Sequence, residues 1–283
     1  MKLSIIIPSY NQGRFIGRTL DSIIAQDDPD CEIILMDGGS TDSTLAVVER
    51  YRDKLSVMVS QRDGGQSDAL MRGYGLATGD YIGWQNSDDV YLPGSFAQFR
   101  ARLAADQATG AVADVYYGNQ VVMGPDDQVL YGKIFGPFQL PYLLYAGWNI
   151  TNQSSFFSRK KIQEIGGFDA SLHYAMDFDF YVRLARGRAR FVWHDAYWGG
   201  FRIHDLSKGS TLHATRDREY IMLRQRYVPG YDAGRPWARQ FRLRRAWLKT
   251  KRILWLLGSG RIARMLRDRS RPSPALLKGG VGA

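Results

Sequence analysis

The first 105 residues alternate short apolar runs with segments whose apolar positions recur at helical spacing. The runs rich in β-branched residues, which we expect to be strands, lie at 3–8, 32–37, 55–60 and 80–84. The segments with helical periodicity follow them, at about 14–26, 40–51, 66–76 and 93–105. Strands that alternate with helices in this way predict a doubly wound α/β fold, with a mostly parallel sheet covered on both faces.

Beyond residue 105 the pattern changes. A hairpin is expected over 115–131, a helix that starts near Asp177, and a strand at 190–194. Residues 216–270 are predicted to form a helical extension, and the end at 271–283, rich in Pro, Gly and small residues, is expected to be disordered. The predicted organisation is therefore one α/β domain over 1–215, with halves at about 1–105 and 106–215, followed by the extension and the tail.

The formal net charge of +10 comes from the end of the chain. Residues 235–283 hold 14 Lys or Arg and one acid, so the rest of the chain is slightly acidic. Between 235 and 267 the bases alternate with Trp and Leu in a helical pattern, which is typical of helices that lie in the interface of an anionic membrane. The alternative is a helix that packs its apolar face on the domain. A nucleic-acid partner is not expected, because the body is acidic and no recognition motif occurs.

Cysteine content and apolar segments bear on the location of the protein. Cys31 is the single cysteine, so no intrachain disulfide can form, which suits a reducing compartment. The sequence shows no signal peptide and no apolar stretch of the roughly 18–20 residues that span a bilayer. We therefore expect a cytoplasmic protein, held peripherally on the inner face of the cytoplasmic membrane by its basic segment.

Two adjacent carboxylates, Asp88 and Asp89, follow the fourth predicted strand. Like charges side by side are tolerated most easily where a cation binds, and Mg²⁺ or Mn²⁺ favours one or two carboxylates together with substrate phosphates. The pair therefore indicates a phosphate-bearing substrate, and the alternative is a solvated turn. The sequence contains no Gly-x-Gly-x-x-Gly after the first strand and no Walker-type loop, which argues against dinucleotide-dependent dehydrogenases and P-loop enzymes.

Polar residues also follow the other three predicted strands. Ser9 and Tyr10 follow the first, Asp37 ends the second, and Asp63 comes shortly after the third. In doubly wound sheets ligands bind at the carboxyl ends of the strands, so these side chains are expected to meet at one edge. At that edge Asp37 can accept a hydrogen bond from a base or a ribose, or it can simply begin its Gly-Gly-Ser turn.

Several motifs, in this order, resemble the family 2 glycosyltransferases with a GT-A fold, over about residues 3–210. The motifs are Ser-Ile-Ile-Ile-Pro-Ser-Tyr-Asn at 4–11, Glu-Ile-Ile-Leu-Met-Asp-Gly-Gly-Ser-Thr-Asp at 32–42, Asp-Gly-Gly-Gln-Ser-Asp-Ala at 63–69 and Asn-Ser-Asp-Asp at 86–89. The resemblance implies inverting transfer of a sugar from a nucleotide sugar, of the UDP type, to a hydroxyl of a glycan or lipid-linked acceptor in cell-surface polysaccharide or glycoconjugate synthesis. The alternative is a non-catalytic nucleotide-sugar-binding or scaffolding member of a membrane-associated polysaccharide assembly complex.

The resemblance also implies roles for individual residues. The residues implied to bind the nucleotide and the donor sugar are Pro8, Ser9, Tyr10, Asp37, Asp63, Gln66, Asp68, Ser87 and Asp88. A Mg²⁺ or Mn²⁺ cofactor is implied to bind Asp89, with His204 near the metal and the diphosphate. Asp177, at the start of a helix, is implied to be the general base that removes the proton of the acceptor hydroxyl.

The chain departs from the family pattern near two of these residues. Many members have Glu-Asp at the base motif, whereas here Met176 precedes Asp177, so Asp179 stays open as the alternative base. Gly64 stands where related sequences often have a lysine, which removes one positive charge near the donor.

Overall fold

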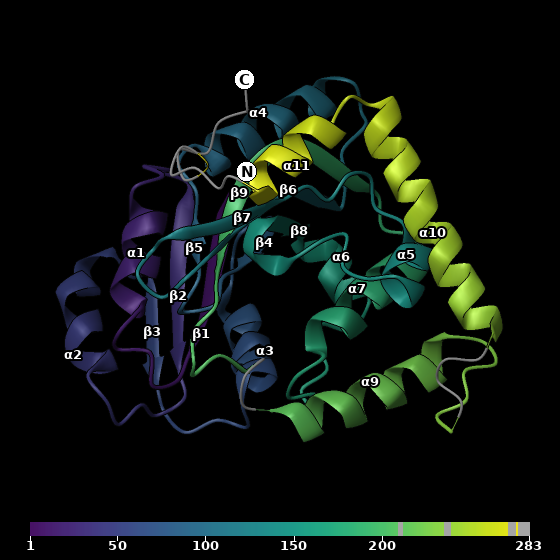
Figure 1. The fold of residues 1–283 in the computed structure, drawn as a ribbon. Helices are drawn as coiled ribbons and strands as arrows, with labels where there is room; N and C mark the ends of the chain where they lie inside the picture. Colours follow the sequence, from purple (N-terminus) through teal and green to yellow (C-terminus); the bar gives the residue numbers. More distant parts are fainter. Residues whose placement is uncertain (209–211, 235–238, 271–275, 277–283) are drawn as a thin grey trace.

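The computed structural model describes residues 1–208, 212–234, 239–270 and 276 (Figure 1). In this part of the chain nine strands form one sheet, in the order β3-β2-β1-β4-β8-β6-β9-β5, with β7 paired to β6. Its first half consists of four mutually parallel strands: β1 (Leu3–Ser9), β2 (Cys31–Asp37), β3 (Val57–Ser60) and β4 (Tyr81–Trp84). The α/β class and the four expected strands of the first half are confirmed.

The second half of the sheet is mixed. It consists of β5 (Val90–Tyr91), β6 (Val115–Met123), β7 (Val129–Lys133), β8 (Ser155–Ser158) and β9 (Phe191–Arg202). Strand β8 runs antiparallel to both β4 and β6, whereas β9 runs parallel to β6. The expected hairpin is β6–β7.

Strand β9 is much longer than the strand expected at 190–194. It continues through Gly199 and Gly200, two residues that the sequence pattern does not associate with a strand, as far as Arg202. The reason is close packing, because a Cβ atom at Gly199 would lie 2.0 Å from the carbonyl oxygen of Gln153. The extra residues bring Arg202 alongside the Asp88-Asp89 pair, which makes β9 part of the site described below.

Helices cover both faces of the sheet. Side chains that alternate along β1 divide between two cores, with Ile5 and Ile7 in one and Ile6 in the other. The helices of the first core are α1 (Ile16–Ile24), α2 (Thr44–Val48), which continues into the 3₁₀ helix η1 (Glu49–Lys54), and α4 (Ser95–Ala108). Those of the second core are α3 (Gln66–Leu76), α5 (Leu140–Tyr145), α6 (Arg159–Glu164) and α7 (Met176–Arg186).

The predicted extension is helical and packs on the domain. It consists of α9 (His213–Tyr227), α10 (Arg239–Gly258) and α11 (Ile262–Ser270). In Figure 1 α9 and α10 lie along the outer edge of the molecule, and α11 turns back toward β7. Leu223 of α9 and Phe241 of α10 belong to the second core, and Asp268 of α11 accepts a hydrogen bond from the hydroxyl of Tyr197 at 2.6 Å. The tail predicted to be disordered lies outside the described residues, except for Leu276.

None of the helices within the described ranges combines the length and the apolar character that crossing a bilayer requires.

Two glycines of α3 provide a test of the helix-on-sheet packing. A Cβ atom at Gly73 would lie 2.6 Å from Cγ2 of Ile6, whereas a Cβ atom at Gly75 would have no atom within 4 Å. We expect Gly73→Ala to lower the free energy of unfolding by about 1–3 kcal/mol through overpacking. Gly75→Ala, the matched control, should raise it by about 0.5–1 kcal/mol through helix propensity. Urea unfolding of both variants measures the difference, and equal effects would contradict the packing of α3 on β1.

Candidate active site

The loops after the first three strands are tied together at one edge of the sheet. The backbone N–H of Gly38 donates to the carbonyl oxygen of Ser9 at 2.9 Å, and that of Asn11 donates to Oγ of Ser40 at 2.8 Å. The carboxylate of Asp63 packs directly against Gly38, where a Cβ atom would approach Oδ2 of Asp63 to 2.9 Å. The expected meeting of the strand ends is therefore present.

Asp37 is buried in this edge and organises its own turn. Its carboxylate accepts hydrogen bonds from the N–H groups of Gly39 and Ser40 at 3.1 and 3.0 Å, and from the hydroxyl of Ser60 at 2.7 Å. The turn role that the sequence left open is thus observed, and it joins the ends of β2 and β3.

The loop after β1 presents a surface for a flat group. Pro8 pairs with Met36 inside the sheet, and the buried hydroxyl of Ser9 has no hydrogen-bond partner among the described residues. Tyr10, which comes next, is 59% exposed. The exposed ring of Tyr10 is suited to stacking on a nucleotide base.

The segment that begins α3 carries the next group of predicted residues. Asp68 accepts the N–H of Gly64 at 2.9 Å, and Asp63 accepts that of Gly65 at 2.8 Å, so both acids hold the loop before the helix. Gln66 instead links loops, since its amide nitrogen donates to Oδ1 of Asn86 at 2.7 Å.

The two adjacent aspartates face different surroundings. Asp88 is partly exposed, and its Oδ2 lies 3.0 Å from Nε2 of the buried His204. Asp89 is fully buried, and its carboxylate accepts hydrogen bonds from the N–H of Arg202 at 2.7 Å and from the amides of Gln153 and Asn86 at 2.8 and 2.9 Å. Burial, together with the charge of Asp88, raises the pKa of Asp89 well above its usual range.

These surroundings decide which groups fit a divalent cation. The pair Asp88 and His204 supplies an oxygen and a nitrogen ligand of the kind that Mn²⁺ accepts. No group of three or more His, Cys, Asp or Glu side chains that could hold a metal occurs in the part of the chain that the structure describes. A cation held by this pair would therefore take further ligands from substrate phosphates and water, as Mg²⁺ and Mn²⁺ commonly do. The buried Ser87 precedes the pair and lies in the same loop.

The two acids in the first turn of α7 have different roles. Asp179 is fully buried and is paired with Arg183 at 2.6 Å and with the hydroxyl of Tyr227 at 2.5 Å, so it is a structural ion-pair residue. Among the described residues, Asp177 accepts only a local hydrogen bond, from the N–H of Phe178 at 2.8 Å. Burial raises the pKa of Asp177 to about 6, against the opposing effects of that hydrogen bond and of Lys208. A carboxylate with this pKa is suited to general-base work near neutral pH.

Lys208 is a residue of this site that the sequence patterns did not single out. Its ammonium group donates to Oε1 of Gln66 at 2.7 Å and to the carbonyl oxygen of His173 at 3.1 Å. Desolvation by the atoms around its ammonium group lowers the pKa of Lys208 to about 8, although Asp177 and Asp88 raise it. The positive charge of Lys208 is therefore within electrostatic reach of both Asp177 and Asp88. Only the folded chain brings it there, because Lys208 lies more than 140 residues from Gln66.

Glu219, in α9, is a second residue that the sequence did not identify. Its carboxylate, 4% exposed, accepts the backbone N–H groups of His173, Tyr174 and Ala175 at 2.8, 2.9 and 2.8 Å. These residues come immediately before α7, so Glu219 holds the N-terminal end of the helix that carries Asp177. Its only sequence signal is an acid within a strongly basic extension.

Comparisons with known proteins bear on the family of the chain and on its fold. The model of the family described as Glycosyl transferase family 2 matches residues 4–166. A PGL/p-HBAD biosynthesis glycosyltransferase of Mycobacterium bovis (strain BCG / Pasteur) is 33% identical over 183 residues, which cover 64% of this chain and 68% of that protein. An uncharacterized glycosyltransferase of Rickettsia typhi is 28% identical over 219 residues, covering 74% of this chain and 66% of its own length.

Solved structures share the fold at lower identity. S. aureus TarS 1–349 in complex with UDP-GlcNAc has a TM-score of 0.64 and 21% identity, with 81% of this chain and 67% of that chain covered. The mannosyltransferase PcManGT from Pyrobaculum calidifontis, in complex with GDP-Man and Mn²⁺, has a TM-score of 0.56 and 18% identity, with 80% and 64% covered.

The sheet and the polar loops at its strand ends define a GT-A glycosyltransferase fold, as the structural neighbours bear out. The chain belongs to glycosyl transferase family 2, since the family model matches more than half of its length, and it is accordingly a transferase enzyme.

Replacing Asp177 tests its role as the base. We expect Asp177→Asn to lower kcat by roughly 10²–10⁴-fold with donor affinity unchanged, because only the proton acceptor is lost. The reactive form is the carboxylate, whose pKa is about 6, so wild-type kcat should fall about tenfold per pH unit below that value and the residual rate of the variant should not. Steady-state rates from pH 5 to pH 8 measure both effects. Turnover that survives in Asp177→Asn but is lost in a stably folded Asp179→Asn would identify Asp179 as the base.

Replacing Glu219 tests the support of α7 by α9. In Glu219→Gln one carboxylate oxygen becomes an NH₂ group that faces backbone donors, so we expect a loss of about 1.5–3 kcal/mol in the free energy of unfolding. Because α7 carries Asp177, kcat should also fall while donor affinity stays the same. Thermal unfolding and a kcat-against-KM comparison measure this, with the exposed Arg218→Gln on the same helix as the control. Unchanged kcat in a destabilised variant would limit Glu219 to a structural role.

Proposed function

We propose that the protein transfers a sugar from a UDP-sugar to a hydroxyl group of a glycan or lipid-linked acceptor, with inversion at the anomeric carbon. The observation that carries this proposal is the line of hydrogen bonds from Lys208 through Gln66 to Asn86, which connects the segment before Asp177 with the Asp88-Asp89 loop. Through it the acid suited to be a base and the residues suited to bind a diphosphate form one site.

In the proposed reaction each group has a defined task. The loop of Ser9 and Tyr10 receives the nucleotide base, and Asp63, Gln66 and Asp68 shape the loop near the ribose. Asp177 removes the proton of the acceptor hydroxyl as that oxygen attacks the face opposite the leaving diphosphate, and this one-step attack inverts the configuration. Lys208 places a positive charge near the diphosphate, where negative charge develops in the transition state.

The proposal includes a divalent cation. When bound, Mg²⁺ or Mn²⁺ would supply Lewis-acid stabilisation of the negative charge on the leaving diphosphate. Asp88 and His204 are the residues that would hold it. Asp89 is the ligand implied by the family pattern. In this proposal it would instead support the site without binding the cation, since its buried carboxylate orients the loop and the backbone of Arg202. A complex of PcManGT holds Mn²⁺ with GDP-Man, and TarS binds UDP-GlcNAc, which supports nucleotide-sugar chemistry of this kind.

The proposed acceptor places the reaction at a membrane surface. A lipid-linked acceptor would lie at a membrane, and the basic segment at 235–267 would hold the enzyme on an anionic membrane surface as a peripheral protein. The name of the mycobacterial relative, a PGL/p-HBAD biosynthesis glycosyltransferase, is compatible with a glycoconjugate product.

The metal and the donor can be tested together. We expect Mn²⁺ or Mg²⁺ to be required for hydrolysis of one member of a panel of UDP- and GDP-sugars, with a UDP-sugar preferred. The apparent Mn²⁺ affinity should fall at least about tenfold in Asp88→Asn and in His204→Ala, because each removes one protein ligand. Titration of activity and of thermal stabilisation with Mn²⁺ measures this.

Asp89→Asn serves as the comparison. It should lower the unfolding temperature, because its new NH₂ group meets the N–H donors that the carboxylate now accepts. Normal stability with lost Mn²⁺ binding in Asp89→Asn, and normal binding in Asp88→Asn, would make Asp89 the ligand. Full turnover by chelator-stripped enzyme would refute the metal-dependent reaction altogether.

A further inference from the structure

Helix α10 has two apolar faces, and only one of them is covered by the domain. Phe241, Leu248 and Leu256 are buried, and Trp255 packs edge to face on Trp193, with their ring centroids 5.5 Å apart and an interplanar angle of 73°. These residues point toward the domain, and Figure 1 shows α5 on the inner side of the helix. The alternative that the sequence left open, a helix packed on the domain, is therefore correct for this face.

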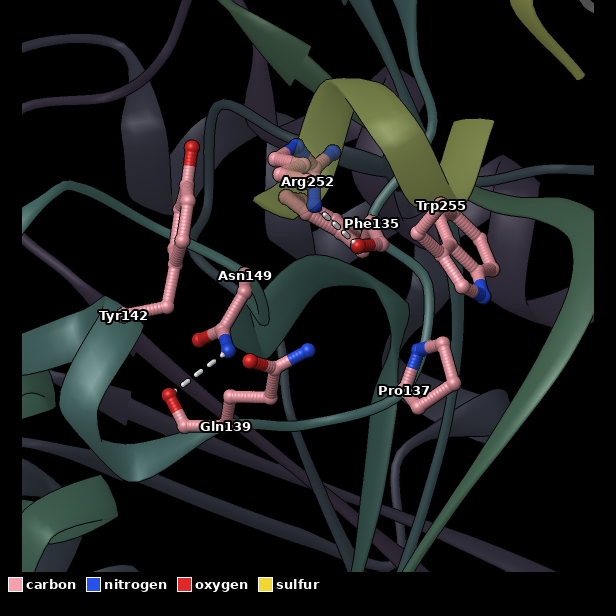
Figure 2. Close-up of a pocket in the computed structure, with 7 residues that line it drawn as sticks. All are labelled: Phe135, Pro137, Gln139, Tyr142, Asn149, Arg252 and Trp255. Atoms are coloured by element: carbon pink, nitrogen blue, oxygen red, sulfur yellow. Dashed lines mark hydrogen bonds between the residues drawn. The ribbon is translucent and has the colours of Figure 1, made fainter. Parts of the chain in front are cut away.

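The covered face is fastened by polar contacts as well. Figure 2 shows Arg252 and Trp255 of α10 above a recess whose other lining residues are Phe135, Pro137, Gln139, Tyr142 and Asn149. The guanidinium group of Arg252 donates to the carbonyl oxygens of Ile134 and Phe135 and lies 5.2 Å from the ring of Tyr142. These contacts fix the rotation of α10 about its axis, so the direction of its opposite face is determined.

The opposite face carries a stripe of large apolar side chains in solvent. Leu243, Trp247, Leu254 and Leu257 follow one another at helical spacing and are 60%, 60%, 61% and 52% exposed. With about 100° of rotation per residue, all four lie within about 40° of one line along the helix. Single exposed apolar residues are common on proteins, but an aligned row of four on one helix indicates a docking surface.

Basic residues border this stripe on both sides. Arg242 and Lys249 lie along one edge, and Lys251 lies along the other, where its ammonium group is 5.3 Å from the ring centroid of Trp247. Within the described ranges none of these three bases has an acidic side chain at ion-pair distance, and α10 itself contains no Asp or Glu. The bases are thus available to an anionic partner.

We propose that this face of α10, with the stripe of Leu243, Trp247, Leu254 and Leu257, inserts into the interface of a membrane that contains anionic lipids. The inference rests on the peripheral attachment proposed above and names the surface responsible for it. Apolar side chains flanked by bases match the acyl boundary and the charged headgroups of such a membrane. A second copy of this chain fits less well, because two such faces together would place many bases, and no acid of α10, against one another.

The test uses the full chain and vesicles without donor or metal, so that it does not depend on turnover. We expect wild-type protein to sediment with vesicles of equal parts phosphatidylglycerol and phosphatidylcholine, and not with phosphatidylcholine alone. The double variant Trp247→Gln and Leu254→Gln should bind at least about tenfold more weakly, because it removes apolar area without changing charge. The matched control, Leu76→Gln with Leu130→Gln, replaces exposed leucines elsewhere and should bind like wild type.

The possible outcomes are distinct. Hydrolysis of the donor should be the same in the stripe variant and in wild type, which shows that the site is intact. Equal vesicle binding by wild type and the stripe variant would overturn the proposal. It would also be overturned if wild type were a dimer in sedimentation velocity and the stripe variant a monomer. Lost hydrolysis by every protein, with the expected vesicle binding, would instead count against the proposed reaction and leave the membrane surface supported.

Discussion

The site depends above all on the buried carboxylate of Asp89. Its three hydrogen-bond donors come from separate segments: Asn86 from the loop after β4, Gln153 from the 3₁₀ helix η2 (Asn152–Ser154), and the backbone of Arg202 from the end of β9. A buried charge is costly unless it is satisfied in this way, so the three segments must meet for the domain to be stable. The first half and the second half of the sheet are joined at this point, and Asp88 and His204 are brought together as a consequence.

The C-terminal extension completes the same site rather than standing apart from it. Glu219 of the extension holds the residues before α7 and thereby the position of Asp177. Lys208, in the segment of the domain that leads into the extension, bridges His173 and Gln66. The extension also carries the exposed stripe of α10. Support of the proposed base and the proposed attachment to a membrane thus belong to adjoining helices, which would keep the donor site at a constant orientation to the proposed lipid-linked acceptor.

In each of the two pairs of neighbouring acids, the two carboxylates have different surroundings. In Asp88-Asp89 one carboxylate is buried and satisfied by neutral donors, while the other faces His204. In the pair of α7, Asp179 is neutralised by Arg183, and Asp177 is left with a raised pKa and no ion partner among the described residues. Each pair therefore leaves one member for the proposed chemistry, because the hydrogen bonds or ion pair of the other stabilise the fold.

The sequence alone determined the α/β class, the four parallel strands of the first half and the segments that meet at their ends, because periodicity and turn residues are local properties of the chain. By resemblance to a family it also pointed to Asp88, Asp89, Asp177 and His204 as expected site residues. It could not decide between Asp177 and Asp179, or show that Asp89 is enclosed, since burial and partners such as Tyr227 and Gln153 come from distant segments. Lys208, Glu219 and the outward face of α10 were likewise decided only by tertiary structure, because long-range packing determines which side chains are neighbours and which face of a helix is left in solvent.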